Sequence, residues 1–235
     1  MRRGALPVLV LALAAAVLLG VGLGTVWIPP GTVVRLVAWK LGLAGYPAGV
    51  AESAAVILFE LRLPRVALAA VVGAGLAVSG AIFQSLFRNP MADPAIIGVS
   101  SGAALGAIAA ILLGGGAILG GLLVPGSAFV AALLVAALVY RLARFGPAVQ
   151  VATLLLAGIA VAAMVSAVIT LLMAFSGEQV RSIYFWLLGG LSGRGWSSVL
   201  AAGPLVLVGT AIALVGTGSL NLMALGDERA AQLGL

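Results

Sequence analysis

Long uncharged runs separated by short polar segments make up most of the chain. Six runs reach, or nearly reach, the roughly 20 residues that a helix needs to cross a bilayer. None of them alternates apolar and polar residues as a barrel strand would. The runs cover residues 5–26, 66–87, 95–113, 117–140, 150–173 and 197–216. The third is short and rich in glycine. The pattern predicts an all-α fold, a polytopic transmembrane helix bundle with about six spans.

Two connectors between these runs are too polar to cross a membrane, and we expect them at its surface. In the first, Pro29-Pro30 precedes residues 31–42, which could form a short surface helix because proline is favoured at the first helical position. The second, residues 174–196, contains Glu178 and Arg181. It also carries aromatic rings of the kind that favour the lipid headgroup level. These are Tyr184, Phe185, Trp186 and Trp196.

Composition agrees with the pattern and excludes several classes of site. Of the 235 residues, 63% are hydrophobic and 8% are charged, which is too little charge to cover a water-soluble domain. The chain has no cysteine and no histidine, so thiol or imidazole zinc sites, histidine haem ligation and Ser-His or Cys-His catalysis are excluded. The net charge of +6 is scattered between apolar runs, so we expect no nucleic-acid partner. We also expect no cofactor.

The first apolar run sets the expected orientation. It is long for a signal peptide and further spans follow, so we interpret it as a transmembrane helix. The twelve basic residues divide evenly between the two predicted sides of the membrane, so the positive-inside rule does not decide the orientation. Arg2 and Arg3 stand directly before the first helix, which usually dominates, and they predict a cytoplasmic N-terminus. Arg62 and Arg65 then lie outside, against the usual bias.

The most informative segment runs from residue 62 to residue 106. Arg62-Leu63-Pro64-Arg65 directly precedes the apolar run 66–87, and the proline-bounded turn 88–94 directly follows it. Gly98, Gly102 and Gly106 follow at every fourth position, a spacing that lets helices pack backbone to backbone.

Other segments give weaker indications. Met164, Ser166 and Thr170 lie at near-helical spacing in the fifth run, where both helix packing and a pathway lining are open. No ionisable residue stands in mid-span, which argues against an ion-coupled carrier and an intramembrane enzyme. The chain has no Gly-x-x-x-x-Gly-Lys-Ser/Thr loop and therefore no ATP site of that kind. After the sixth run we expect a short helix on the inner surface. Asp227 and Glu228 would lie in its first turn, and Gly234 would end it.

Several motifs in a fixed order resemble the FecCD family of ABC importer permeases, which carry iron–siderophores, haem and cobalamin. The resemblance covers essentially the whole chain. The matching segments are Arg62-Leu63-Pro64-Arg65, 73–80 with Gln84, Arg88-Asn89-Pro90-Met91-Ala92-Asp93-Pro94 with Gly98, 155–158, 186–191 with Trp196, and 220–234.

The resemblance implies a fold of ten transmembrane helices. Residues 1–235 would then be a single permease domain, incomplete at its C-terminus, in which 220–235 is a cytoplasmic coupling helix. Arg62 and Arg65 would dock a binding protein, and Met164, Ser166 and Thr170 would lie beside the translocation path. The residues implied to meet the ATPase are Leu225, Gly226, Asp227, Glu228, Arg229, Ala230, Ala231, Gln232, Leu233 and Gly234.

The implied function is inward transport of an iron chelate, a siderophore or haem, across a bacterial or archaeal cytoplasmic membrane. Cobalamin is the alternative cargo, and a truncated, non-transporting assembly subunit is the alternative role. The implied partners are a second permease subunit, two ATP-binding subunits, an extracytoplasmic substrate-binding protein and the lipid bilayer. The chain itself would not be an enzyme, because a separate subunit would hydrolyse ATP.

Overall fold

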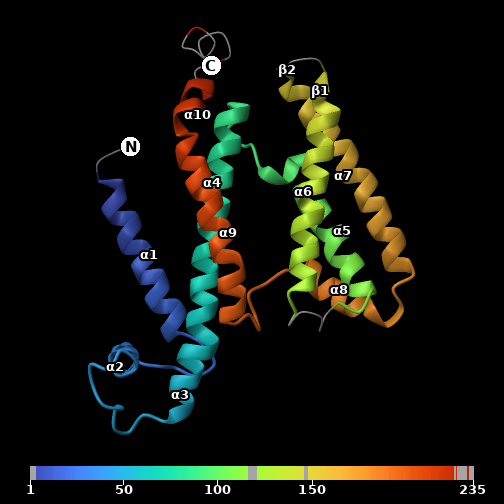
Figure 1. Ribbon diagram of the computed structural model, residues 1–235. Coiled ribbons are helices and arrows are strands. Elements are labelled where there is room, and N and C mark those ends of the chain that lie inside the picture. The colour runs from blue at the N-terminus through green and yellow to red at the C-terminus, as the bar shows by residue number, and fades with distance from the viewer. Residues whose placement is uncertain (1–3, 116–120, 146–147, 225, 227–231, 233–235) are drawn as a thin grey trace. The chain divides into compact units, whose positions relative to one another are not determined.

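The computed structural model describes residues 4–115, 121–145, 148–224, 226 and 232, and nearly all of its regular structure is helical (Figure 1). The α-helices are α1 Ala5–Gly22, α2 Pro30–Lys40, α3 Glu52–Val56, α4 Leu63–Phe87, α5 Val99–Leu112, α6 Leu123–Ala143, α7 Val151–Ala174, α8 Val180–Leu187, α9 Trp196–Val215 and α10 Thr217–Ala224. The π-helix η1 spans Ile57–Arg62, and the 3-10 helices η2 and η4 span Pro94–Ile97 and Gly177–Gln179. Two short strands, β1 Arg144–Phe145 and β2 Ala148–Val149, pair antiparallel, with Arg144 opposite Val149.

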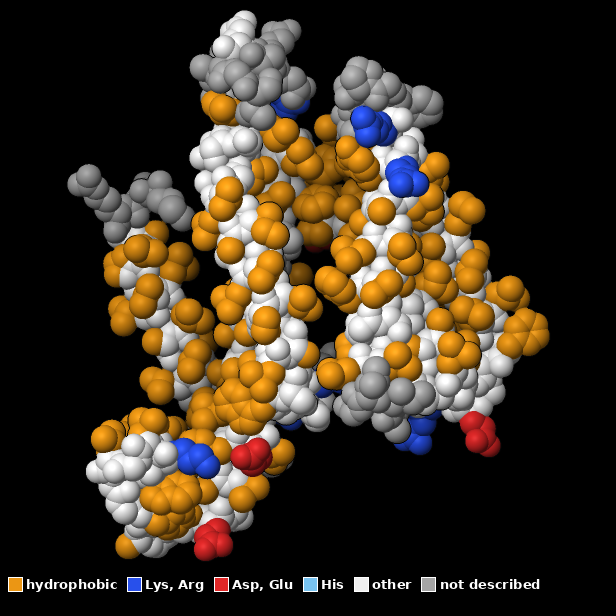
Figure 2. Space-filling model, in the orientation of Figure 1, with side chains coloured by type: hydrophobic (Ala, Val, Ile, Leu, Met, Phe, Trp, Pro, Cys, Tyr) orange, Lys and Arg blue, Asp and Glu red, His pale blue; other side chains and the backbone are white. Residues whose placement is uncertain are grey.

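Five helices in the described part of the chain are long and apolar enough to cross a membrane. They are α1, the continuous helix Glu52–Phe87, α6, α7 and α9. Apolar side chains cover these helices, and most charged side chains visible in Figure 2 lie near helix ends. The predicted all-α transmembrane bundle is confirmed. Of the six predicted spans, five correspond to these long helices, and the third, predicted to be short, corresponds to the apolar helix α5 with 14 residues.

The third predicted span is short because its first residues form a 3-10 turn and not the start of an α-helix. Residues Pro94–Ile97 form the 3-10 turn η2, whose start is capped where the Ala95 N–H donates to the Asp93 carboxylate at 2.6 Å. Gly98 then takes a left-handed conformation with φ of +79°. The α-helix begins only after this turn, four residues later than hydrophobicity alone predicts.

The chain separates into two compact units, and each has its own core. The first contains Met1–Ala77 and Leu191–Leu214, and it packs Val21, Ile28, Leu36 and Leu58 together. Here the predicted short helix is confirmed as α2, which starts at Pro30 and buries Leu36, whereas its place at a membrane surface stays a prediction. The second contains Val78–Gly190 and Val215–Leu235. The single domain over residues 1–235 stays a prediction.

In the second unit, glycines let α5 lie directly against the backbone of α6. A Cβ on Gly102 would come within 2.9 Å of the Ala131 carbonyl oxygen. A Cβ on Gly106 would collide with the Ser127 carbonyl and stand 2.6 Å from the Ala131 Cβ. The prediction of backbone-to-backbone packing at this glycine spacing is therefore confirmed. A Cβ on Gly158 of α7 would likewise collide with the Ile96 carbonyl of η2.

Candidate functional site

The two polar motifs of the sequence lie at opposite ends of one helix. Arg62 closes η1 directly before α4, and Arg88 follows directly after it. The 25 residues of α4 span about 37 Å at about 1.5 Å each, more than the roughly 30 Å of a hydrocarbon core. By length and composition, α4 is therefore long enough to cross a membrane.

Arg62 is buried and bonded within the chain. Only 8% of its surface is exposed. Its Nη1 donates to the carbonyls of Val21 and Gly22, each at 2.8 Å, and its Nη2 donates to the carbonyl of Val26. Arg62 is therefore held inside the first unit and is not exposed in the described structure. Its docking to an outer protein stays a prediction.

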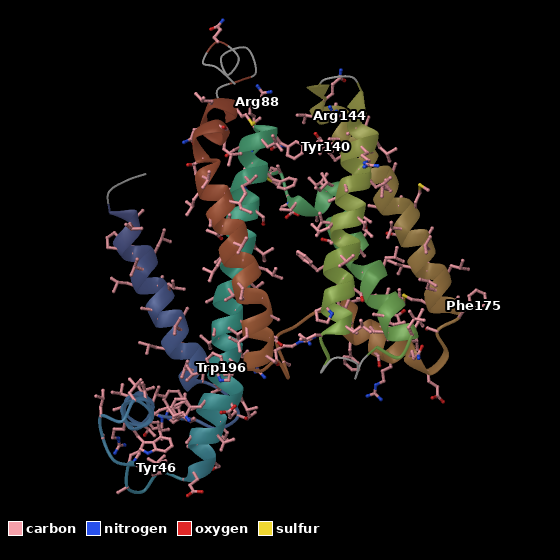
Figure 3. All side chains as sticks on the ribbon, in the orientation of Figure 1. Tyr46, Arg88, Tyr140, Arg144, Phe175 and Trp196 are labelled. Atoms are coloured by element: carbon pink, nitrogen blue, oxygen red, sulfur yellow. The ribbon has the colours of Figure 1, made fainter. Side chains whose placement is uncertain are left out.

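The backbone around Arg62 is π-helical because a proline interrupts the helix. The Leu63 N–H donates to the Leu58 carbonyl, five residues earlier, instead of to Phe59. The next residue, Pro64, has no N–H to offer. The Phe59 carbonyl accepts instead from the Trp196 indole Nε1 at 2.9 Å, so the start of α9 is fastened to this turn. Figure 3 labels Trp196 at that helix start.

Arg65, one helical turn after Arg62, is exposed. The two arginines of the motif therefore differ, although they are chemically identical and three residues apart. Of these two arginines, only Arg65 is exposed in the described structure.

At the far end of α4, Arg88 occupies a backbone position that usually belongs to glycine. Its φ is +50°, and it is the one non-glycine residue with positive φ among those described. The Arg88 N–H bonds to the Ser85 carbonyl and the Asn89 N–H to the Gln84 carbonyl, the pair of bonds that closes a Schellman motif. A left-handed conformation costs an L-residue roughly 1–2 kcal/mol.

The turn after Arg88 is built from side-chain caps. The Met91 N–H donates to the Asn89 Oδ1 at 2.9 Å, and Asp93 caps the following 3-10 helix. The helix stop predicted at this motif is confirmed, since α4 ends at Phe87. Arg88 also reaches the C-terminal segment, because a Cβ on Gly226 would lie 3.3 Å from the Arg88 Nη1.

Most of the predicted coupling helix falls outside the described residues. Those positions are Leu225, residues 227–231 and residues 233–235. Gly226 has φ of +107°, and Gln232 is helical and exposed. The coupling role therefore stays a prediction.

The predicted pathway residues all lie on α7 and are exposed, but Met164 faces a different side of the helix from Ser166, two residues later. Met164 is 70% exposed, and Ser166 and Thr170 are also exposed. The Thr170 hydroxyl donates to the Ser166 carbonyl at 2.9 Å, the local bond that Ser and Thr commonly make in helices. The pathway role of these three residues stays a prediction.

One structurally important residue of this region, Gly24, was not identified from the sequence, and the hydrogen bond made by another, Trp196, was not predicted. Gly24 borders the Arg62 guanidinium, because a Cβ there would stand 2.5 Å from Nη2. Trp196 supplies the Phe59 carbonyl with its donor. Pro64, just before the apolar run 66–87, was the signal that a backbone carbonyl would need an outside partner. Among the described residues, no group of acidic, histidine or cysteine side chains could hold a metal ion.

Comparison with known proteins gives one consistent result. The model of the FecCD transport family matches residues 11–235. The chain is 47% identical over 187 residues to the cobalamin import system permease protein BtuC of Halobacterium salinarum, covering 80% of this chain and 50% of that protein. It is 42% identical over 182 residues to the hemin transport system permease protein HmuU of Yersinia pestis, covering 76% of this chain and 54% of that protein.

Two further likenesses extend over almost the whole chain. The Fe(3+)-citrate import system permease protein YfmE of Bacillus subtilis is 36% identical over 235 residues, covering 99% of this chain and 67% of that protein. A solved structure described as a metal-chelate type ABC transporter in an inward-facing conformation matches with a TM-score of 0.79 and 30% identity, covering 97% of this chain and 66% of that one. The chain thus spans about half to two thirds of the length of these proteins. With a family model that matches from residue 11 to residue 235, the chain belongs to the FecCD transport family.

Proposed function

We propose that the chain is a membrane-spanning permease subunit of a binding-protein-dependent ABC importer that carries a metal chelate inward. The family match over residues 11–235 is the observation that carries this proposal. Relatives named for cobalamin, hemin and ferric citrate support a bulky chelate as the cargo class. Within that class we favour an iron chelate, a siderophore complex or haem. Cobalamin is the second candidate because of the 47% identical relative.

Uptake by cells tests the proposal and separates the cargoes. We expect deletion of the gene that encodes this chain to reduce accumulation of radiolabelled ferric hydroxamate, haem or cyanocobalamin to background, and a plasmid-borne copy to restore it. Loss of one label names the cargo. Unchanged uptake of all three chelates would contradict the proposal and favour a non-transporting assembly subunit.

The energy source we propose is a separate ATP-hydrolysing pair of subunits below the membrane. The sequence contains no phosphate-binding loop of the P-loop type. Arg88 and Gly226 lie close together at the end of α4, and Gly226 leads into residues 227–235, which we propose as the coupling segment. A second permease subunit would complete the path. Co-purification of an ATPase with the tagged chain checks this assembly.

We propose that the N-terminus faces the cytoplasm of a bacterial or archaeal cell. Because α4 spans the bilayer, a reporter at each of its ends reads the orientation. Leu61 is 55% exposed and Met91 is 82% exposed, and the chain has no native cysteine. In intact cells an impermeant maleimide should label Leu61→Cys, whereas Met91→Cys should react only after permeabilisation. The reverse pattern would place the N-terminus outside.

A further inference from the structure

Arg62 bonds to carbonyl groups at the C-terminal end of α1, where the helix cannot satisfy them itself. The last carbonyls of a helix have no partner within it, and they carry the negative end of the helix dipole. Val21 and Gly22 are the last two residues of α1, and both of their carbonyls accept from the Arg62 Nη1. The Val26 carbonyl, from the loop that follows, accepts from Nη2. One buried cation thus holds the end of α1 and its loop together.

The fit around this guanidinium leaves no spare room on one side. A Cβ on Gly24 would stand 2.5 Å from Nη2, 3.0 Å from Cζ and 3.3 Å from Nε. A side chain at Gly24 would therefore require the Arg62 guanidinium to shift from its present position. The arginine and the glycine act as one feature, although nearly 40 residues separate them.

The remaining surface of α1 does little to hold it in place. Val21 and Gly22, at its C-terminal end, are its only buried residues in the described structure. The position of α1 on the first unit is therefore set at this end, where Val21 joins the core with Ile28, Leu36 and Leu58.

We infer that Arg62 is a positioning residue, which fixes the end of α1 and the loop Leu23–Pro29 against the π-helical turn. Arg65 is then the arginine of the motif that is free to meet an outer protein. Only this last statement rests on the proposed function. For Arg62 to reach a partner protein, it would have to leave three carbonyl acceptors in a buried site, which makes such a role costly.

Hydrogen exchange of two amides tests the inference without any transport assay. The Leu23 N–H bonds to the Leu19 carbonyl at 2.8 Å, and the Ile28 N–H bonds to the Gly22 carbonyl at 3.3 Å. In the purified full chain, Arg62→Met should accelerate exchange of both amides by about tenfold or more. Arg65→Met, the matched control, should leave both rates unchanged. Equal rates in the two variants would overturn the inference.

Two more substitutions guard against simple misfolding. Arg62→Lys should give intermediate exchange, because an ammonium offers three donors from one point and not a planar fork. Gly24→Ala removes no donor and no charge, yet it should displace the guanidinium and accelerate exchange as Arg62→Met does. Wild-type exchange rates of the two amides in Gly24→Ala would refute the positioning role of Arg62, even if Arg62→Met failed to accumulate.

Uptake of the chelate identified by gene deletion separates positioning from docking. Gly24→Ala keeps both arginines, so a role of Arg62 in docking alone predicts wild-type uptake for this variant. The positioning role predicts reduced uptake, matching that of Arg62→Met. Were no chelate transported at all, the proposed function would fail while the exchange result still stood.

Discussion

Replacing Gly106 with alanine should sharply reduce the amount of folded protein in the membrane. Alanine is ordinarily the better helix former, by about 1 kcal/mol, so a gain would be expected from propensity alone. At Gly106, however, the new methyl group would collide with the Ser127 carbonyl and the Ala131 Cβ, and neither lies at the end of a flexible side chain. Overpacking of this kind typically costs about 1–3 kcal/mol.

The matched control is Gly126→Ala on the facing helix α6. Gly126 has no atom within 4 Å of an added Cβ, so the same chemical change should be neutral or stabilising there. Thermal unfolding in detergent, together with recovery from size-exclusion chromatography, compares the two variants. Equal midpoints would mean that α5 and α6 do not pack as closely as the structure shows.

Reversing the charge at Arg65 should eliminate uptake without changing how much protein the membrane holds. The side chain is exposed, so Arg65→Glu leaves the fold intact. If acidic residues of an outer binding protein meet this arginine, a glutamate places like charges together, which costs several kcal/mol. We expect uptake at the level of the gene deletion, with basal ATP hydrolysis by the assembled complex retained.

The variant Arg65→Lys tests whether the effect of Arg65→Glu is due to the charge of the side chain. Arg65→Lys keeps the charge and should retain a large part of the uptake, with a stronger dependence on ionic strength at the surface. Wild-type uptake in Arg65→Glu would show that Arg65 has no part in docking. Loss of uptake in both variants alike would point to a geometric role for the guanidinium that its charge does not explain.

Hydrophobicity predicted the helices well because each apolar run is long and depends on local sequence alone. The end of α4 at Phe87 and the start of α2 at Pro30 both follow from prolines and turn residues close by. The close approach at Gly106 was predictable for the same reason, since glycine spacing is itself a local pattern. The start of α5 was missed because Pro94–Ile97 is as apolar as a helix but is bent into a 3-10 turn.

The candidate site was less predictable, since its contacts join distant residues. Arg62 and Arg65 look equivalent in the sequence. What distinguishes them is a set of carbonyls about 40 residues earlier in the chain. Likewise, the π-helical turn is completed by an indole 137 residues later. Neither relationship leaves a periodic trace in the sequence.

The separation between Arg62 and its partners has a consequence for biosynthesis. Val21 leaves the ribosome 41 residues before Arg62 does, a delay of about 2–8 s at roughly 5–20 residues per second. During that interval the last carbonyls of α1 have no guanidinium from which to accept a hydrogen bond. The sequence of α1 from Ala5 to Gly22 carries no charge that would need a partner before Arg62 has left the ribosome.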